Sequence, residues 1–333
     1  MQIAKPTYFD RFRCTAGACP DSCCKEWDVL VDEASAARYR ALNGPLGDRL
    51  REVLYDEDGV TYMTIEDRRC PMWRLDGLCR IQAELGESAL CHTCWDFPRL
   101  THDYGDFREL QLELSCPVAA ELILSAPAAP FLREEVPGGE IPEYDAEAMA
   151  VLKTTRGEML RILADSDRPV GETLALGLMY GYQAQSLLDG ADTAPFDPGA
   201  ALEEARDFAR TGDPKAMTDF FLGLELLTPE WEALLRSPEP GNWSAEYLAL
   251  ARYFVERYWL QAVSDYDLAG RVKFMIISCL LIRHLGGNIF RTAQLYSKEI
   301  ENDADNVDAI LDAAYSHPAF TDDQLLGLLL AER

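Results

Sequence analysis

Apolar positions recur every three or four residues along most of the second half of the chain. Between residues 145 and 163 the apolar side chains with this spacing are Met149, Leu152, Met159, Leu160 and Leu163. This spacing places them on one face of a helix. Similar patterns predict further helices at residues 171–188, 198–210, 214–227, 229–235, 244–264, 266–285, 288–301, 307–315 and 322–331. The second half is therefore predicted to be helical throughout.

The first 125 residues have a weaker and more mixed pattern. It predicts a short helix at residues 32–42 and a hairpin whose strands, at residues 52–55 and 60–66, flank the turn 56–59. Pro, Gly and Glu then dominate residues 126–143, which is typical of a linker. We predict a mainly α fold with two domains. A cysteine-rich domain with little β structure spans residues 1–125, and an all-helical domain spans residues 144–333.

Composition and charge narrow the class of protein. The chain has 333 residues, of which 48% are hydrophobic and 26% charged, as in ordinary globular proteins. Its net charge of −26 argues against nucleic acid or an anionic membrane as a partner. We find no secretory signal and no apolar run long enough to span a membrane. We therefore expect a cytoplasmic protein, in a reducing compartment where clustered cysteines are more often metal ligands than disulfides.

Nine of the ten cysteines lie in the first 116 residues, while Cys279 stands alone in an apolar run and is expected to be an inert core thiol. The candidate metal ligands are Cys14, Cys19, Cys23, Cys24, Cys70, Cys79, Cys91, Cys94 and Cys116. Two residues separate Cys91 from Cys94, so both thiolates could reach one metal. Prolines follow three of the nine cysteines, which is common at iron–sulfur sites, but the spacing leaves zinc open as the alternative.

Four cysteine-bearing segments together resemble the flagellin lysine-N-methylase family. They are FRCTAGACPDSCCKEWD at residues 12–28, the stretch from Cys70 through GLCRIQAELGE at 70–87, LCHTCWDFPR at 90–99 and ELSCP at 113–117. The cysteine pattern is also related to that of proposed zinc- or iron-chelating proteins. The resemblance covers about the first 120 residues, and the helical half carries no comparable motif.

The resemblance implies an enzyme that transfers methyl groups from S-adenosylmethionine to lysine side chains of flagellin. It also implies a [4Fe–4S] cluster bound by some of the nine cysteines, without indicating which four. The C-x3-C-x2-C run of radical enzymes is absent, because Glu26 stands where the third thiol would be. Radical and polar methyl transfer therefore both stay open, and the sequence identifies no general base.

Residues next to the cysteines are candidates for binding the cofactor. The aromatic rings of Trp27 and Trp95 could face a sulfonium, and Asp28 lies beside the first of them. Arg99 could hold the cofactor carboxylate. Alternatively, the tryptophans could pack over the metal site and Arg99 could cap a helix. Two other classes of protein compete with the enzyme: a zinc-stabilised interaction module without catalysis, and a metal-chelating protein.

Overall fold

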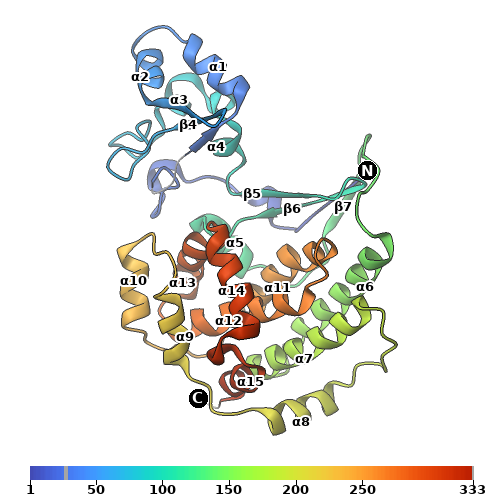
Figure 1. The fold of residues 1–333 in the computed structure, drawn as a ribbon. Coiled ribbons are helices and arrows are strands. Elements are labelled where there is room, and N and C mark those ends of the chain that lie inside the picture. Colours follow the sequence, from blue (N-terminus) through green and yellow to red (C-terminus); the bar gives the residue numbers. More distant parts are fainter. Residues whose placement is uncertain (26–28, 332–333) are drawn as a thin grey trace.

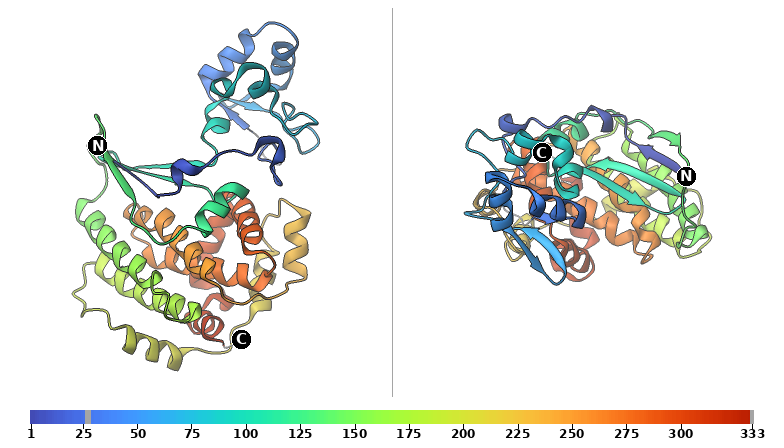
Figure 2. Two further views of the ribbon diagram at one scale, coloured as in Figure 1. Left: turned by 180° about the vertical axis from the view of Figure 1, so that it is seen from behind. Right: turned by 90° about the horizontal axis from the view of Figure 1, so that it is seen from above.

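The computed structural model describes residues 1–25 and 29–331, and it is mainly α-helical, as predicted. Figure 1 shows a small lobe that stands above a larger helical body, close to the end of the body that holds α5 and α13. The view from behind in Figure 2 shows the N-terminal chain running from the body up into the lobe.

The small lobe is built on a three-stranded sheet with the order β2-β4-β3. Strand β2 spans Val29–Val31, and the predicted hairpin is confirmed as β3 (Leu54–Glu57) paired antiparallel with β4 (Val60–Met63). The predicted helix at residues 32–42 is confirmed as α1 (Glu33–Ala41). Asp32 caps it by accepting a hydrogen bond from the backbone N–H of Ser35. The other helices of the lobe are α2 (Pro45–Val53), α3 (Arg80–Leu85) and α4 (His92–Asp96).

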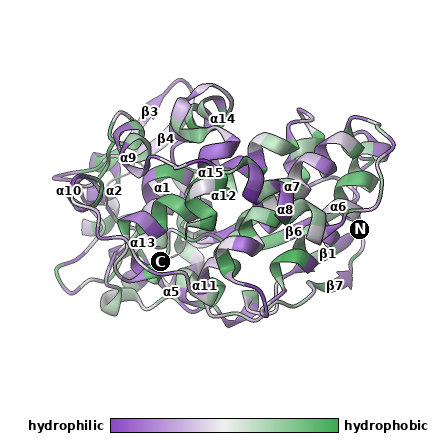
Figure 3. Ribbon diagram, turned by 90° about the horizontal axis from the view of Figure 1, so that it is seen from below, coloured by the Kyte–Doolittle hydropathy of each residue, from purple (hydrophilic) through white to green (hydrophobic). Residues whose placement is uncertain are grey.

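A second sheet joins the lobe to the body. Its order is β5-β6-β1-β7, with bounds Arg99–Asp103, Phe107–Leu112, Gln2–Lys5 and Leu132–Glu135. The sequence pattern did not predict this sheet, since β1 pairs in parallel with β6 and antiparallel with β7, both distant in the chain. Strand β7 lies within the segment predicted as a linker, and Figure 3 colours this exposed strand mostly hydrophilic. Helix α5 (Pro117–Leu124) follows β6 and packs on α11 and α13.

The helical body contains every helix predicted for the second half. The long helices are α6 (Ala146–Leu163), α7 (Val170–Leu188), α11 (Ala245–Tyr258) and α12 (Leu268–Leu285). The shorter ones are α8 (Pro198–Phe208), α9 (Pro214–Phe221), α10 (Pro229–Arg236), α13 (Ile289–Tyr296), α14 (Ala304–Ser316) and α15 (Asp322–Leu330). The predicted helix at 288–301 ends in a π-helical turn, Ser297–Glu301, which directly follows α13.

Two hydrophobic clusters hold the chain together. One belongs to the small lobe and includes Val31, Tyr39 and Leu50. The other includes Phe107 of the second sheet together with the buried residues of the body, among them Trp231. The division into domains at residues 125 and 144 stays a prediction. Cys279 is buried in α12, and no helix among the described residues is both long and apolar enough to cross a membrane.

Candidate functional site

A cavity of about 1110 Å³ lies between the small lobe and the helical body. All nine candidate cysteines line it: Cys14, Cys19, Cys23, Cys24, Cys70, Cys79, Cys91, Cys94 and Cys116. The body contributes Gln294 from α13, Lys298 from the π-helical turn, and residues 302–305, which lead from the end of that turn into the first turn of α14. Chain folding therefore brings together thiols that lie up to a hundred residues apart. Their role as metal ligands stays a prediction.

None of the nine cysteines forms a disulfide, and hydrogen bonds link two pairs of their thiols, Cys23 with Cys24 and Cys91 with Cys94. The hydrogen bond with Cys23 lowers the pKa of Cys24 to about 7, while burial raises the pKa of Cys70 to about 12. Cys91 is hydrogen-bonded to Cys94, and this contact lowers the pKa of Cys91. Within residues 1–25 and 29–331, no three His, Cys, Asp or Glu side chains already converge on a point where they could hold a metal ion. The cysteine thiols thus line one cavity, but the described side chains are not arranged as the ligand set of a metal ion.

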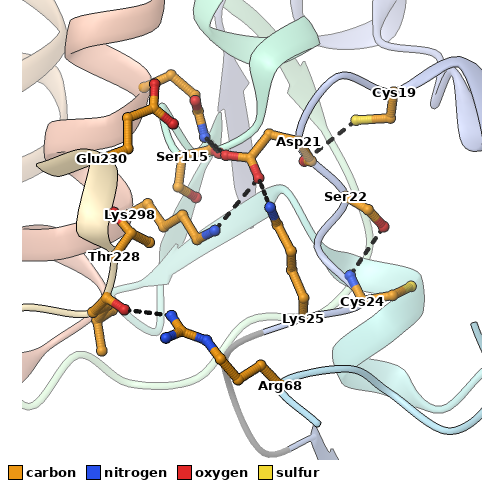
Figure 4. Close-up of polar contacts among 12 residues, drawn as sticks. Cys19, Asp21, Ser22, Cys24, Lys25, Arg68, Ser115, Thr228, Glu230 and Lys298 are labelled. Atoms are coloured by element: carbon orange, nitrogen blue, oxygen red, sulfur yellow. Dashed lines mark hydrogen bonds and ion pairs between the residues drawn. The ribbon is translucent and has the colours of Figure 1, made fainter.

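Asp21 fastens the first cysteine loop to the helical body. Its side chain is 2% exposed and forms ion pairs with Lys25 at 2.8 Å, Arg291 at 2.8 Å and Lys298 at 3.4 Å. Gln294 donates a further hydrogen bond at 3.1 Å, and Figure 4 shows Lys25 and Lys298 pointing toward Asp21. Burial alone would raise the pKa of Asp21, but its hydrogen bonds with Lys25 and Arg291 keep that pKa well below its usual range.

A second contact between the lobe and the body involves Arg68. Its guanidinium donates a hydrogen bond of 2.6 Å to the backbone carbonyl of Leu227, which lies in the loop before α10 and also lines the cavity. Sequence analysis assigned no role to Asp21 or Arg68. The only signal was that Asp21 stands inside the CPDSCC stretch, where a charge among thiols needs a partner.

The structure describes two of the four predicted cofactor-binding residues. Trp95 and Arg99 both line the cavity. The Arg99 guanidinium lies 5.1 Å from the ring centre of Phe12 and 5.9 Å from that of Trp95, and it donates a hydrogen bond of 3.2 Å to the Trp95 carbonyl. Arg99 thus caps the last turn of α4, which was the alternative prediction, while its charge still borders the cavity. Trp27 and Asp28 lie outside the described residues.

Among the described residues, six carboxyl side chains line the same cavity: Asp21, Glu87, Asp96, Glu113, Asp303 and Asp305. Glu113 follows β6 and is 8% exposed, and its Oε1 accepts a hydrogen bond of 2.8 Å from the hydroxyl of Ser115. Burial raises the pKa of Glu113, and the nearby charge of Arg257 opposes that shift. A buried carboxyl with a raised pKa is a candidate proton acceptor. Sequence reasoning missed Glu113, although it opens the ELSCP segment.

A buried polar network supports the π-helical turn. Glu301 ends this turn and lies 3.2 Å from the Arg257 guanidinium, and it accepts hydrogen bonds of 2.8 Å from Tyr258 and 3.1 Å from Tyr253. The network holds the segment from which Lys298 faces the cavity. Short π-helical turns are frequent at functional sites, which agrees with this position.

Two glycines allow the cysteine loops to approach each other closely. A Cβ added at Gly17 would lie 2.8 Å from the carbonyl oxygen of Asp76, and one added at Gly77 would lie 2.8 Å from the Cα of Gly17. Gly77 also has a φ of +79°, which other residues rarely adopt. Gly17 stands between Cys14 and Cys19, so any shift of its loop also moves these thiols.

We expect Gly17→Ala to destabilise the small lobe by about 1–3 kcal/mol, because the backbone must move apart to accept a methyl group. Urea unfolding followed by tryptophan fluorescence measures this change. The matched control is Gly157→Ala, on an open face of α6 where an added Cβ meets nothing within 4 Å. The control should be neutral or slightly stabilising. Equal stability of the two variants would contradict the close approach of the loops.

Comparison with known proteins gives the family. The chain is 32% identical over 145 residues, 40% of its length, to the flagellar biosynthetic protein FliU of Salmonella muenchen, and this match covers 84% of FliU. The same identity over 145 residues relates it to proteins called lysine-N-methylase in Salmonella typhimurium and Salmonella choleraesuis. The match spans 35% of the length of each of those two relatives. No family model and no solved structure matches the chain.

The fold and the cavity define a mainly helical protein with a cysteine-lined site between a small lobe and a larger body. The extent of the match to FliU adds that the chain belongs to the family of FliU and the lysine-N-methylases, as the cysteine pattern predicted.

Proposed function

We propose that the protein is an S-adenosylmethionine-dependent methyltransferase that acts on lysine side chains of flagellin. The main support for the proposal is that the nine cysteines of the family pattern and the carboxyl of Glu113 line one cavity. The names of the relatives, lysine-N-methylase and flagellar biosynthetic protein, support both the reaction and the substrate.

The donor set of the cavity fits a metal centre by its chemistry. Cysteine thiolates are the ligands that iron–sulfur clusters use, and nine cysteines, none of them in a disulfide, line this one cavity. We propose that the cluster is a [4Fe–4S] cluster held by cysteines among the nine. When bound, such a cluster would offer an iron site for the amino-acid part of the cofactor and would hold the cysteine loops together.

The carboxylates that line the cavity suit a lysine side chain. A lysine ammonium has a reference pKa of about 10.4, so it must lose a proton before its nitrogen can attack a methyl group. Asp303 and Asp305 would attract the charged ammonium into the cavity, and the Glu113 carboxylate would accept its proton. The nitrogen lone pair then forms the new N–C bond while the S–C bond of the sulfonium breaks and its electron pair stays on sulfur. This polar route needs no radical.

Arg99 and Trp95 are proposed to bind the methyl donor. The Arg99 guanidinium borders the cavity and can pair with the carboxylate of the cofactor. Trp95 is 49% exposed as a residue, and its ring can face the sulfonium. The same two side chains contact each other, so the cofactor would bind to a site that is already ordered.

The direct test is incubation of anaerobically purified protein with methyl-labelled S-adenosylmethionine and flagellin from the same organism. We expect label on flagellin lysines, and visible absorption from thiolate-to-iron charge transfer in the same sample. Flagellin with its surface lysines acetylated is the control, because acetylation removes the nucleophile. Colourless protein with bound zinc and no label on lysine would instead support the zinc-stabilised interaction module.

A further inference from the structure

Cysteines that line the cavity are attached to two different hydrophobic cores. We propose that they form two groups, that each group binds its own four-thiolate metal centre, and that the boundary falls between the adjacent residues Cys23 and Cys24. The body centre, as we name it, consists of Cys14, Cys19, Cys23 and Cys116. The lobe centre consists of Cys24, Cys79, Cys91 and Cys94. This inference rests on the metal-binding part of the proposed function and is independent of methyl transfer.

The hydrophobic packing separates the two groups. Cys116 belongs to the core that continues into the helical body, and it immediately precedes α5. Cys91 is buried in the separate core of the small lobe, and Cys24 and Cys79 pack against that same core. Cys116 of the body group is therefore fixed to a different body from Cys24, Cys79 and Cys91 of the lobe group.

The backbone crosses from one body to the other at the adjacent cysteines. Before the crossing, Asp21 is hydrogen-bonded to Gln294, whose side chain also donates a hydrogen bond of 2.6 Å to the carbonyl of Ser115, the neighbour of Cys116. After the crossing, the carbonyl of Cys24 accepts a hydrogen bond of 2.9 Å from the backbone N–H of Cys70 in the lobe. Cys23 thus follows a segment fastened to the body, and Cys24 is fastened to the lobe.

The electrostatic neighbours of the thiols agree with this division. Besides burial, the charges of Cys19 and Cys14 raise the pKa of Cys116. In the lobe, burial and the charges of Cys24 and Cys91 raise the pKa of Cys79. Cys23 and Cys24 share a hydrogen bond, which is where the two groups touch.

The number of thiols fits two centres and leaves one cysteine over. Four thiolates complete either a [4Fe–4S] cluster or a tetrahedral zinc site. The body group holds four. The lobe group holds a fifth, Cys70, whose thiol is buried and donates to the sulfur of Met63 at 3.5 Å. We therefore exclude Cys70 from the lobe centre. A metal there would also stabilise a lobe whose own core is small.

The test compares Cys23→Ala with Cys24→Ala in the full chain, purified anaerobically. Iron, acid-labile sulfide and zinc are measured per chain for both variants and for the unaltered protein. We expect two centres in the unaltered protein. Cys23→Ala should lose the metal of the body centre and keep the other, and Cys24→Ala should show the reverse. Iron with sulfide identifies a cluster, and zinc without sulfide identifies a zinc site.

Cys70→Ala is the control and should keep both centres. Far-UV circular dichroism of each variant checks that the helical body remains folded. A single centre in the unaltered protein, or loss of the same metal in both variants, would overturn the two-centre proposal while leaving a metal-binding methyltransferase intact. Absence of any metal would instead overturn the metal-binding part of the proposed function.

Discussion

Glu113→Gln is expected to lower the rate of methyl transfer to flagellin lysine by about 10²–10⁴-fold, the usual contribution of a general base. Glutamine keeps the shape of the side chain and can still accept the hydrogen bond that Ser115 donates to Glu113. It cannot take the proton of the lysine ammonium. Single-turnover assays with methyl-labelled S-adenosylmethionine measure the effect directly.

The pH dependence separates a proton acceptor from a merely structural residue. Because burial raises the pKa of Glu113 above its ordinary value of 4.5, the wild-type rate should fall as the pH drops through that raised pKa. This decrease in rate at low pH, the acidic limb of the pH–rate profile, should disappear in Glu113→Gln. Asp305→Asn, at another position on the cavity wall, should weaken binding of flagellin and keep the limb. An acidic limb that persists in Glu113→Gln would contradict the assignment.

The helices were predictable because their signals are local. Helix α6 combines apolar positions on one face with a cap at Asp145, whose side chain accepts hydrogen bonds from the backbone N–H groups of Glu147 and Ala148. The second sheet carries no such local signal. Its strand β1 consists of Gln2–Lys5, and its register is fixed by partners more than a hundred residues away. Short strands of this kind are recognised only after the chain has folded.

The candidate site was likewise predictable from the sequence only in part. Cysteines are rare and chemically distinctive, so nine of them in one half predicted a shared site, and the structure places all nine on one cavity. Carboxylates and ammonium groups are common on every surface. Nothing in the sequence therefore identified Lys298 as a partner of Asp21. Their meeting depends on how α13 and the following turn lie against a loop some 270 residues earlier in the chain, as the Arg291–Asp21 contact illustrates.

The attachment of the first cysteine loop should depend on the charge of Asp21. Asp21→Asn removes the charge that holds Lys25, Arg291 and Lys298 together and leaves these cations beside a buried neutral amide. We expect a loss of about 2–4 kcal/mol in the free energy of unfolding at pH 7. This is somewhat below the cost of breaking a fully buried pair, because Arg291 is partly exposed to solvent.

The same charge predicts how the difference between wild type and Asp21→Asn varies with pH. The pKa of Asp21 is lowered in the folded protein, so its stabilising contribution is fully present above the unfolded value of 3.8 and is lost as the pH falls toward the folded pKa. The two urea-unfolding curves should therefore differ at pH 7, and the difference should begin to shrink below about pH 4 and keep shrinking as the pH falls further. Asp10→Asn, which breaks the exposed Lys5–Asp10 pair, is the control and should change stability by less than about 1 kcal/mol. A gap between wild type and Asp21→Asn that stays constant down to acidic pH would show that Asp21 acts through its shape, and the loop would then be held by packing rather than by charge.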